Sequence, residues 1–420
     1  MMGEKVVKML SQLVMMVLMA RILGPEELGN LMYCFAIASA FIFLNTLGLD
    51  SLLVKVFVER VNKQYSFLKH ALVLRVIGAI CSIVLINFAG YWLVSGDAHL
   101  LLFLISLYHL FMPFNVYEWF YQAQGRGDLS AYGLITGHLS GFAFRLACLF
   151  LGGELIWLGI AYIVEMAAMA CCYIFIARNI EKHSTQIKQV PKLSAQRMIN
   201  LLKDASPLIL SGALVLLYMK VDQLMLGYMV DAKEVGIYVA ATRLSEAWYF
   251  IGLTLIGVYF PKLLETKKQF GLLAYYKEII NKGRWLIWGA ILLASITTLV
   301  STPLIYFLYG KSYQASADVL TLTIWAVPFV YLGATSTKMY VALGDYKSIL
   351  WRSVFGLCAN LVLNYHLIPQ SGASGAALAS LISQAMASYF FNFVKTENKI
   401  ASIQTRLIFF WFLFKDKVSY

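Results

Sequence analysis

The sequence predicts an all-α, polytopic membrane protein with about twelve transmembrane helices, arranged as two six-helix lobes around a central cavity. An apolar composition, an alternating charge pattern and an internal repeat support this fold class. Hydrophobic residues make up 60% of the 420 positions and charged residues 13%. An ordinary soluble domain is about 45–50% apolar and about 25% charged. The composition therefore argues against a water-soluble enzyme, and the continuous apolar runs exclude the alternating pattern of a membrane β-barrel.

Each predicted span is an apolar run of about 20 residues, the length of helix that crosses a bilayer. The runs cover approximately residues 5–23, 31–54, 70–94, 99–121, 131–152, 155–178, 205–229, 235–260, 284–309, 316–342, 348–368 and 373–394. The apolar stretch Leu407–Phe414 is too short to cross, so we expect it to lie at the cytoplasmic interface.

The loops between these spans alternate in charge. Of the 34 Lys and Arg residues, 25 fall on the side that holds both termini and 3 fall on the other side. Basic loops remain in the cytoplasm, so both termini are predicted to be cytoplasmic. The net charge of +12 has the same origin, and nucleic acid is therefore not an expected partner.

Three short segments recur in order, each linking one span to the span six further along. Glu27-Leu28-Gly29 matches Glu234-Val235-Gly236, Gly127-Asp128 matches Gly344-Asp345, and Gly159 matches Gly375. The order indicates two six-helix halves related by a parallel repeat. The predicted division is an N-terminal lobe at 1–178, a cytoplasmic linker at 179–203, a C-terminal lobe at 204–394, and a cytoplasmic or interfacial tail at 395–420.

The sequence carries no signal of a catalytic centre. All predicted outer loops are short, no G-x-x-x-x-G-K-[ST] phosphate loop is present, and no His, Cys, Asp or Glu cluster has metal-ligand spacing. We therefore predict no catalytic residue, no metal and no cofactor beyond a coupling ion, H⁺ or Na⁺. His109 and His138 fall within spans, where a hydrogen-bonded packing role is favoured over a proton relay.

The informative residues are charges deep within spans, because a charge at mid-bilayer costs at least about 2.5–3.5 kcal/mol on insertion scales. Two interpretations remain open: interhelical ion pairs that only stabilise the fold, or the lining of a polar cavity where transporters of repeated design bind substrate. The deep charges are Arg145, Glu165, Lys220, Asp222, Arg243 and Glu246.

Helix geometry separates two of these charges. Lys220 and Asp222 are two residues apart and point about 200° apart on a helix, so both cannot face one cavity. Arg243 and Glu246 are three apart and share a face. We expect Asp222 to pair with Arg243 and Lys220 to face the cavity.

Motifs along the chain resemble the Wzx-type O-antigen flippases, of the multidrug/oligosaccharidyl-lipid/polysaccharide exporter superfamily. The matches run from about residue 4 to residue 394, and the N-terminus is shorter than is usual in that family. The segments that carry the resemblance are Ala20–Gly29, Leu47–Leu49, Tyr121–Arg126, Lys220–Gly227, Glu234–Tyr238, Ala240–Glu246 and Ser374–Ala379.

The resemblance implies a flippase that moves undecaprenyl-diphosphate-linked O-antigen oligosaccharide from the cytoplasmic to the periplasmic leaflet of the bacterial inner membrane by alternating access. The cations Lys220, Arg145 and Arg243 would contact the diphosphate. The carboxylates Asp222, Glu165 and Glu246 would couple an ion or form pairs. The implied partners are the lipid-linked oligosaccharide, membrane lipids and other polysaccharide-assembly proteins.

Other functions remain open at this point. A cation-coupled multidrug antiporter of the same superfamily shares the fold but should favour acidic cavity residues. A membrane enzyme of polysaccharide assembly should carry a long outer loop, and a purely structural scaffold needs no cavity.

Overall fold

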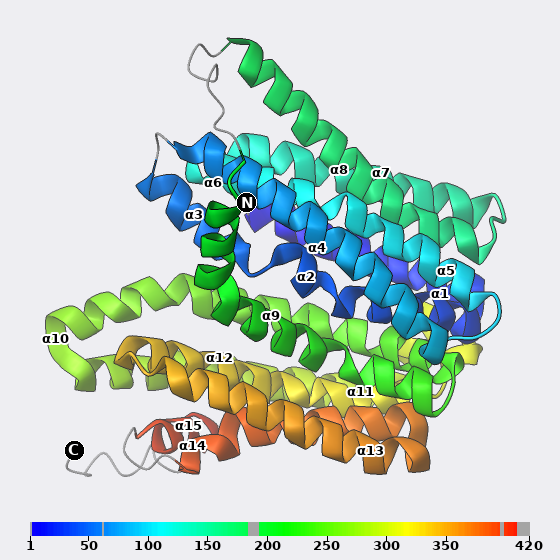
Figure 1. Cartoon of the computed structure of the whole chain (residues 1–420). Coiled ribbons are helices and arrows are strands. Elements are labelled where there is room, and N and C mark those ends of the chain that lie inside the picture. The colour runs from blue at the N-terminus through cyan, green and yellow to red at the C-terminus, as the bar shows by residue number, and fades with distance from the viewer. Residues whose placement is uncertain (1, 61–62, 184–192, 395–398, 410–420) are drawn as a thin grey trace. The chain divides into compact units, whose positions relative to one another are not determined.

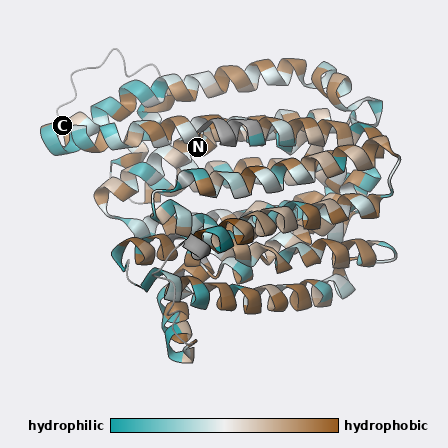
Figure 2. Cartoon of the chain, turned by 90° about the horizontal axis from the view of Figure 1, so that it is seen from above, coloured by the Kyte–Doolittle hydropathy of each residue, from teal (hydrophilic) through white to brown (hydrophobic). Residues whose placement is uncertain are grey.

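The computed structural model describes residues 2–60, 63–183, 193–394 and 399–409 (Figure 1). These residues form helices and contain no strand, which confirms the predicted all-α membrane fold class. The helices divide into an N-terminal unit, Met1–Leu224, and a C-terminal unit, Met225–Tyr420. Hydrophobic residues run along most of the helix lengths (Figure 2), as expected of helices that lie in lipid.

Most of the N-terminal unit is built from long helices joined by short turns. In chain order its α-helices are α1 (Met2–Ala40), α2 (Ile42–Thr46), α3 (Leu49–Glu59), α4 (Gln64–Leu93), α5 (Ala98–Ser106), α6 (Val116–Ala123), α7 (Gly127–Phe150), α8 (Leu155–His183) and α9 (Ala195–Met229). Two short 3₁₀ turns, Leu107–Leu110 and Met112–Asn115, join α5 to α6. The boundary between the two units falls within α9, after Leu224.

After the end of α9, the C-terminal unit continues with a long helix that turns back on itself in Figure 1. Its helices are α10 (Ala232–Tyr309), α11 (Ser316–Ile324), α12 (Ala326–Leu343), α13 (Tyr346–Ala385), α14 (Phe391–Val394) and α15 (Ile400–Ile408). A 3₁₀ turn at Lys311–Tyr313 precedes α11, and a π-helical turn at Met386–Phe390 follows α13.

Among the described residues, nine helical stretches are long and apolar enough to cross a membrane. Three of them contain a glycine with non-helical backbone angles: Gly24 in α1, Gly271 in α10 and Gly372 in α13. Each of these glycines lies between two spans that the sequence predicts as separate crossings. The count of twelve crossings itself stays a prediction.

The predicted second span, residues 31–54, is not one continuous helix. It is interrupted at Phe41 and again at Leu47 and Gly48, which have left-handed backbone angles. A side chain at Gly48 would also collide with the backbone of α9 at Leu208. Both the left-handed backbone angles and the close approach of α9 therefore require glycine at this position. The predicted fourth span, residues 99–121, is likewise broken by the two 3₁₀ turns.

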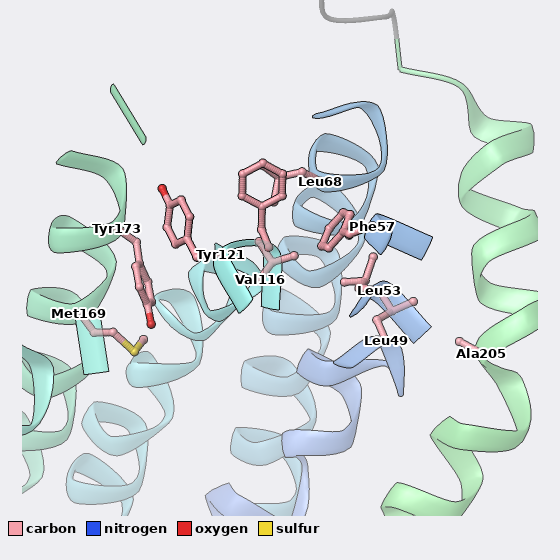
Figure 3. Close-up of a cluster of buried hydrophobic side chains, with 11 residues drawn as sticks. Leu49, Leu53, Phe57, Leu68, Val116, Tyr121, Met169, Tyr173 and Ala205 are labelled. Atoms are coloured by element: carbon pink, nitrogen blue, oxygen red, sulfur yellow. The ribbon is translucent and has the colours of Figure 1, made fainter. Parts of the chain in front are cut away.

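A hydrophobic cluster ties five helices of the N-terminal unit together (Figure 3). Its side chains come from α3, α4, α6, α8 and α9, and aromatic rings meet edge to face within it, such as Phe57 and Phe120 with centroids 5.4 Å apart. The buried members are Leu49, Leu53, Phe57, Leu68, Ala71, Val116, Phe120, Tyr121, Met169, Tyr173 and Ala205. The first part of α9 therefore packs with the N-terminal unit.

Each unit contains a tyrosine packed flat against a glycine of a neighbouring helix. A Cβ atom at Gly133 of α7 would collide with the ring of Tyr173, whose hydroxyl donates to the Ser130 carbonyl at 2.9 Å. A Cβ atom at Gly252 of α10 would collide with the ring of Tyr331, whose hydroxyl donates to the Trp248 carbonyl at 2.6 Å. Small residues at such positions let membrane helices approach closely.

The turns after the predicted fourth and tenth spans have the same backbone pattern. Gly125 and Gly344 have φ of 73° and 77°. The residue after each glycine donates its N–H to a carbonyl five residues earlier, Arg126 to Tyr121 and Asp345 to Tyr340, both at 2.9 Å. This geometry aligns Gly125, rather than Gly127, with Gly344, and it agrees with the predicted repeat.

The last described helix, α15, packs into the C-terminal unit. Leu407 is fully buried in a cluster with residues of α10 and α12, whereas the sequence predicts an interfacial stretch at Leu407–Phe414. Residues 410–414 of that stretch lie outside the described residues. Hydrogen bonds also anchor α15. Gln404 donates from Nε2 to the carbonyls of Leu332 and Ser388, at 3.0 and 2.9 Å.

Candidate functional site

The six deep charges predicted from the sequence are divided between the two units. Arg145 lies on α7, Glu165 on α8, and Lys220 and Asp222 on α9 within the N-terminal unit. Arg243 and Glu246 lie on α10 in the C-terminal unit. The structure describes each unit by itself, so the predicted pairing of Asp222 with Arg243 stays a prediction.

Arg145 and Glu165 form an ion pair between neighbouring helices. Arg145 Nη2 lies 2.6 Å from Glu165 Oε2, and the two side chains are only 10% and 13% exposed. The guanidinium also lies over the ring of Tyr162, with its central carbon 4.7 Å from the ring centroid. An ion pair with so little water around it is stronger than a surface pair, and breaking it leaves a costly buried charge.

His138 extends this pair toward α1. Its Nδ1 atom lies 3.7 Å from Glu165 Oε1, which is longer than a hydrogen bond. Its other ring nitrogen, Nε2, lies 2.6 Å from the Ser11 hydroxyl oxygen. The sequence predicts a hydrogen-bonded packing role for His138, and the contact with Glu165 was not expected.

Glycines on α7 explain how Glu165 comes so close to that helix. A Cβ atom at Gly141 would lie 2.7 Å from Glu165 Cβ, and one at Gly137 would lie 2.7 Å from the Glu165 carbonyl oxygen. Gly133, Gly137, Gly141 and Arg145 recur every four residues and so share one helix face. From this spacing in the sequence, the close contact between α7 and α8 could have been predicted.

Lys220 is linked to the same region through two aromatic rings. Its Nζ atom lies 5.8 Å from the ring centroid of Phe35 on α1. Phe35 stacks on Tyr162, with centroids 4.5 Å apart and planes inclined by 20°. Phe35 and Tyr162 thus link Lys220 to Arg145, two of the three predicted diphosphate-binding cations. Cation–aromatic contacts of this kind hold cations in weakly hydrated surroundings.

In the C-terminal unit, Arg243 and Glu246 form an ion pair of their own. Arg243 Nη1 donates to Glu246 Oε2 at 3.1 Å, which agrees with the prediction that they share a helix face. Their side chains are 37% and 41% exposed within the described structure. Water screens such a pair, so it contributes little to stability.

The sequence interpretation missed one buried ion pair. Arg75 on α4 donates to Asp50 on α3, and the Arg75 side chain is only 2% exposed. Asp50 lies in the first turn after the Leu47–Gly48 break, where a carboxylate favours the positive end of the helix dipole. The position of Arg75 inside an apolar run of the sequence could have indicated that it has a buried carboxylate partner.

Three further polar side chains gather at the same helix break. Asn45 Nδ2 lies 2.6 Å from His109 Nδ1, and the Ser82 hydroxyl lies 3.4 Å from Asn45 Oδ1. His109 Nε2 lies 3.2 Å from the Ala38 carbonyl. These contacts satisfy groups that the broken backbone would otherwise leave bare in an apolar interior. Within the part of the chain that the structure describes, no group of three His, Cys, Asp or Glu side chains could hold a metal.

Comparison with known proteins adds sequence relatives. A family model described as "Polysaccharide biosynthesis protein" matches residues 1–267. The capsular polysaccharide biosynthesis protein CapF of Staphylococcus aureus is 23% identical over 402 residues, or 91% of this chain and 94% of CapF. The probable flippase AglR of Haloferax volcanii is 25% identical over 181 residues, or 41% of this chain and 36% of AglR.

Solved structures with the same fold are also membrane transporters. The lipid II flippase MurJ, in an inward closed conformation, matches with a TM-score of 0.77 and 16% identity over 99% of this chain and 92% of MurJ. An inward-facing multidrug resistance MATE family transporter matches with a TM-score of 0.70 and 16% identity over 95% of this chain and 96% of that one. At this level of identity the likeness shows the fold alone.

Proposed function

Because this chain belongs to the polysaccharide biosynthesis protein family and has the fold of flippases and multidrug transporters, we propose that it is a flippase for a lipid-linked oligosaccharide. The substrate is an undecaprenyl-diphosphate-linked O-antigen or related polysaccharide unit. The protein moves its head group from the cytoplasmic to the periplasmic leaflet by alternating access. The resemblance of the sequence motifs to polysaccharide flippases supports this choice of substrate.

The observation that carries the proposal is the pair of cations held on aromatic rings among membrane helices. Lys220 and Arg145 each lie against a ring, and the two rings stack on one another. A glycan and a diphosphate cannot enter hydrocarbon unaided, because unpaired polar groups and charges are very costly there. Fixed cations replace the water around the diphosphate while the lipid tail stays in the bilayer.

Lys220 is the first choice for contact with the diphosphate, with Arg145 and Arg243 as further candidates. Arg145 is held by Glu165 at 2.6 Å and Arg243 by Glu246 at 3.1 Å. Lys220 Nζ lies 5.8 Å from the ring centroid of Phe35. On a helix Lys220 points about 200° away from Asp222, and this direction is the reason for placing Lys220 first.

A fluorescent lipid-linked oligosaccharide in proteoliposomes tests this assignment. A charge-assisted hydrogen bond contributes about 1.5–3 kcal/mol, so Lys220→Gln should slow flipping about tenfold or more, with normal amounts of folded protein. Lys220→Arg should keep much of the rate, because a cation remains. Lys233→Gln, a change of the same kind at an exposed position in the first turn of α10, is the matched control. Normal flipping by Lys220→Gln would reject the role of Lys220.

The energy source is proposed to be an ion gradient, H⁺ or Na⁺, or consumption of the product downstream. Glu165 and Asp222 are the candidate coupling carboxylates, and Glu246 is a third. Combined Glu165→Gln and Asp222→Asn should remove the dependence of flipping on an imposed ion gradient. Transport that stays fully dependent on the gradient would contradict this assignment.

A cation-coupled multidrug antiporter is the second candidate, because a MATE family transporter shares the fold over 95% of the chain. A membrane enzyme of polysaccharide assembly is a third and belongs to a different class. An antiporter would export organic cations from loaded vesicles, and an enzyme would alter the glycan covalently. Flipping of an unmodified lipid-linked glycan separates the three.

The proposed location is the bacterial inner membrane, with several crossings and both termini in the cytoplasm. Membrane lipids and other polysaccharide-assembly proteins are the proposed partners. Reporter fusions at Lys268 should therefore read cytoplasmic, and fusions at Asp97 and Lys311 should read periplasmic. A periplasmic reading at Lys268 would overturn the predicted topology.

A further inference from the structure

The proton arrangement around His138 is determined by its two neighbours. The Ser11 hydroxyl has one hydrogen, which it donates to the Lys8 carbonyl at 2.9 Å. We therefore assign the 2.6 Å contact between Ser11 and His138 Nε2 as a hydrogen bond that His138 donates and Ser11 accepts. A neutral His138 that donates from Nε2 has no hydrogen on Nδ1. That bare nitrogen faces Glu165 Oε1 at 3.7 Å.

Two hydrogen-bond acceptors, His138 Nδ1 and Glu165 Oε1, thus face one another between side chains that are largely buried. In the part of the chain that the structure describes, His138 Nδ1 is buried and has no hydrogen-bond partner, and the Glu165 side chain is 13% exposed. An acceptor left without a donor in such surroundings is unfavourable. One added proton between Nδ1 and the carboxylate would turn this opposition into a hydrogen bond.

We propose that Glu165 is a displaceable internal counter-anion of Arg145, and that a phosphate-bearing ligand binds Arg145 only as the Glu165–His138 pair takes up one proton. This inference rests on the proposed function and names the regulation of one of its anion sites. Glu165 occupies Arg145 at 2.6 Å, which is where the oxygen of a phosphate would bind.

The charges balance only if the proton accompanies the anion. Arg145 and Glu165 together are neutral, so an incoming phosphate oxygen would add a net negative charge to an apolar site. Protonation of the Glu165–His138 pair cancels that charge. Arg145 then holds the phosphate, while the neutral carboxyl group donates to His138 Nδ1. On release the proton leaves, and Glu165 returns to Arg145.

Several neighbouring groups could influence this exchange. Arg145 and His138 on α7 are the titratable groups that face the Glu165 carboxylate directly. Tyr162 on α8 lies under Arg145. Behind it lie Phe35 of α1, Tyr108 of the first 3₁₀ turn, its ring neighbour His109, and Lys220 of α9.

The test measures binding of inorganic pyrophosphate to the purified full-length protein by calorimetry, in buffers of different protonation enthalpy. The wild type should take up about one proton more per bound pyrophosphate than Glu165→Gln, so its affinity should fall more steeply with rising pH, by up to about tenfold more per pH unit. Glu165→Gln should bind at least as tightly and keep only the proton uptake and pH dependence that pyrophosphate itself contributes. Arg145→Gln should bind more weakly than the wild type.

Glu278→Gln is the matched control. Glu278 pairs with Lys282 at 2.9 Å, and Lys282 lies over the ring of Tyr259 at 4.8 Å. This set also combines a cation, a glutamate and a tyrosine ring, but its cation is a lysine and its side chains are more exposed than those of the Arg145 site. Glu278→Gln should leave pyrophosphate binding and proton uptake unchanged. Thermal unfolding of each variant confirms that a change in binding is not a loss of fold.

The outcomes separate this inference from the proposed function. Lack of pyrophosphate binding, pH-independent binding by the wild type, or unchanged proton uptake in Glu165→Gln would each overturn the exchange at Arg145. Glycan flipping alongside pH-independent binding would keep the proposed function and reject the exchange. Proton-linked pyrophosphate binding without any glycan flipping would keep the exchange and reject the flippase.

Discussion

The two units handle polar groups inside their helices in different ways. The N-terminal unit buries ionisable side chains as opposite charges, Arg75 with Asp50 and Arg145 with Glu165. In the C-terminal unit one buried network joins neutral groups. Tyr340 donates to Asn392 Oδ1 at 2.7 Å, and Asn392 Nδ2 lies 2.7 Å from Gln404 Oε1.

Backbone carbonyls complete the network of the C-terminal unit. The π-helical turn at Met386–Phe390 interrupts the regular hydrogen bonds of the helix. The carbonyl of Ser388 in this turn accepts from both Asn392 Nδ2 and Gln404 Nε2, each at 2.9 Å. Arg352 donates to the Ser336 and Thr337 hydroxyls of this unit, both at 2.6 Å.

The shared packing shows that this difference lies in the polar groups and not in the architecture. Both units place a tyrosine on a glycine, and both end a membrane helix with the same glycine turn. Ion pairs respond to protons and to competing anions, whereas amide and hydroxyl networks do not titrate near neutral pH. The comparison teaches that, among the described ion pairs, those with a buried cation lie in the N-terminal unit, whereas the cations of the C-terminal pairs are more than a third exposed.

The largest effect is expected when the most buried charge is left without its partner. Asp50→Ala should lower the free energy of unfolding by about 3–5 kcal/mol, because Arg75 then stays buried and uncompensated. Thermal unfolding in detergent measures the change. Arg126→Ala, which breaks a pair with side chains 53% and 54% exposed, is the control and should have little effect. Equal losses in both variants would remove the distinction between buried and exposed pairs.

The neutral network of the C-terminal unit should be nearly as costly to break. Gln404→Ala leaves the buried carbonyls of Ser388 and Leu332 with fewer donors, and unsatisfied buried groups cost about 1–3 kcal/mol each. We expect a loss of about 3 kcal/mol that is the same at pH 6 and pH 8. A loss that varies between these two pH values would show that the C-terminal unit also depends on an ionisable group.

The tyrosine–glycine contacts should respond alike in the two units. Gly133→Ala and Gly252→Ala each force the ring of a buried tyrosine to move, and overpacking costs about 1–3 kcal/mol. Gly289→Ala, in a helix position where an added Cβ meets nothing within 4 Å, is the control. Unfolding measurements that find a cost in only one unit would show that the packing is not shared.

The smallest effect is expected at the exposed ion pair of the C-terminal unit. Glu246→Gln should change the free energy of unfolding by less than about 1 kcal/mol, because the Arg243–Glu246 pair is more than a third exposed and water screens it. A loss as large as that of Asp50→Ala would mean that Glu246 is held by a stronger interaction than this pair.

The sequence predicts the membrane fold class, because long apolar runs leave a clear signal. The bends at Gly24, Gly271 and Gly372 lie between predicted spans. The sequence also places Arg145 and Glu165 on adjacent spans at similar depth. The break at Leu47–Gly48 was not predicted, although Asn45, Gly48 and Asp50 interrupt the apolar run there. That break depends on Asn45, Ser82 and His109, which meet only after three helices have packed.

The contact between His138 and Glu165 was also beyond prediction from the sequence. It depends on how α7 and α8 are rotated about their axes, and the glycines at 133, 137 and 141 set that rotation through their close approach. Spacing places His138 within a span, but only the packed helices reveal which carboxylate it faces.

The position of α9 has a consequence for splitting the chain. Its residues up to Leu224 cluster with the N-terminal unit, and Ala205 belongs to the hydrophobic cluster of that unit. A cut between residues 184 and 192 would therefore leave one helix of the N-terminal unit on the other fragment. For two such fragments to reassemble, α9 of the C-terminal fragment would have to pack against the helices of the N-terminal fragment, as in fragment complementation. A cut after Met229 would instead keep α9 with the helices it packs against.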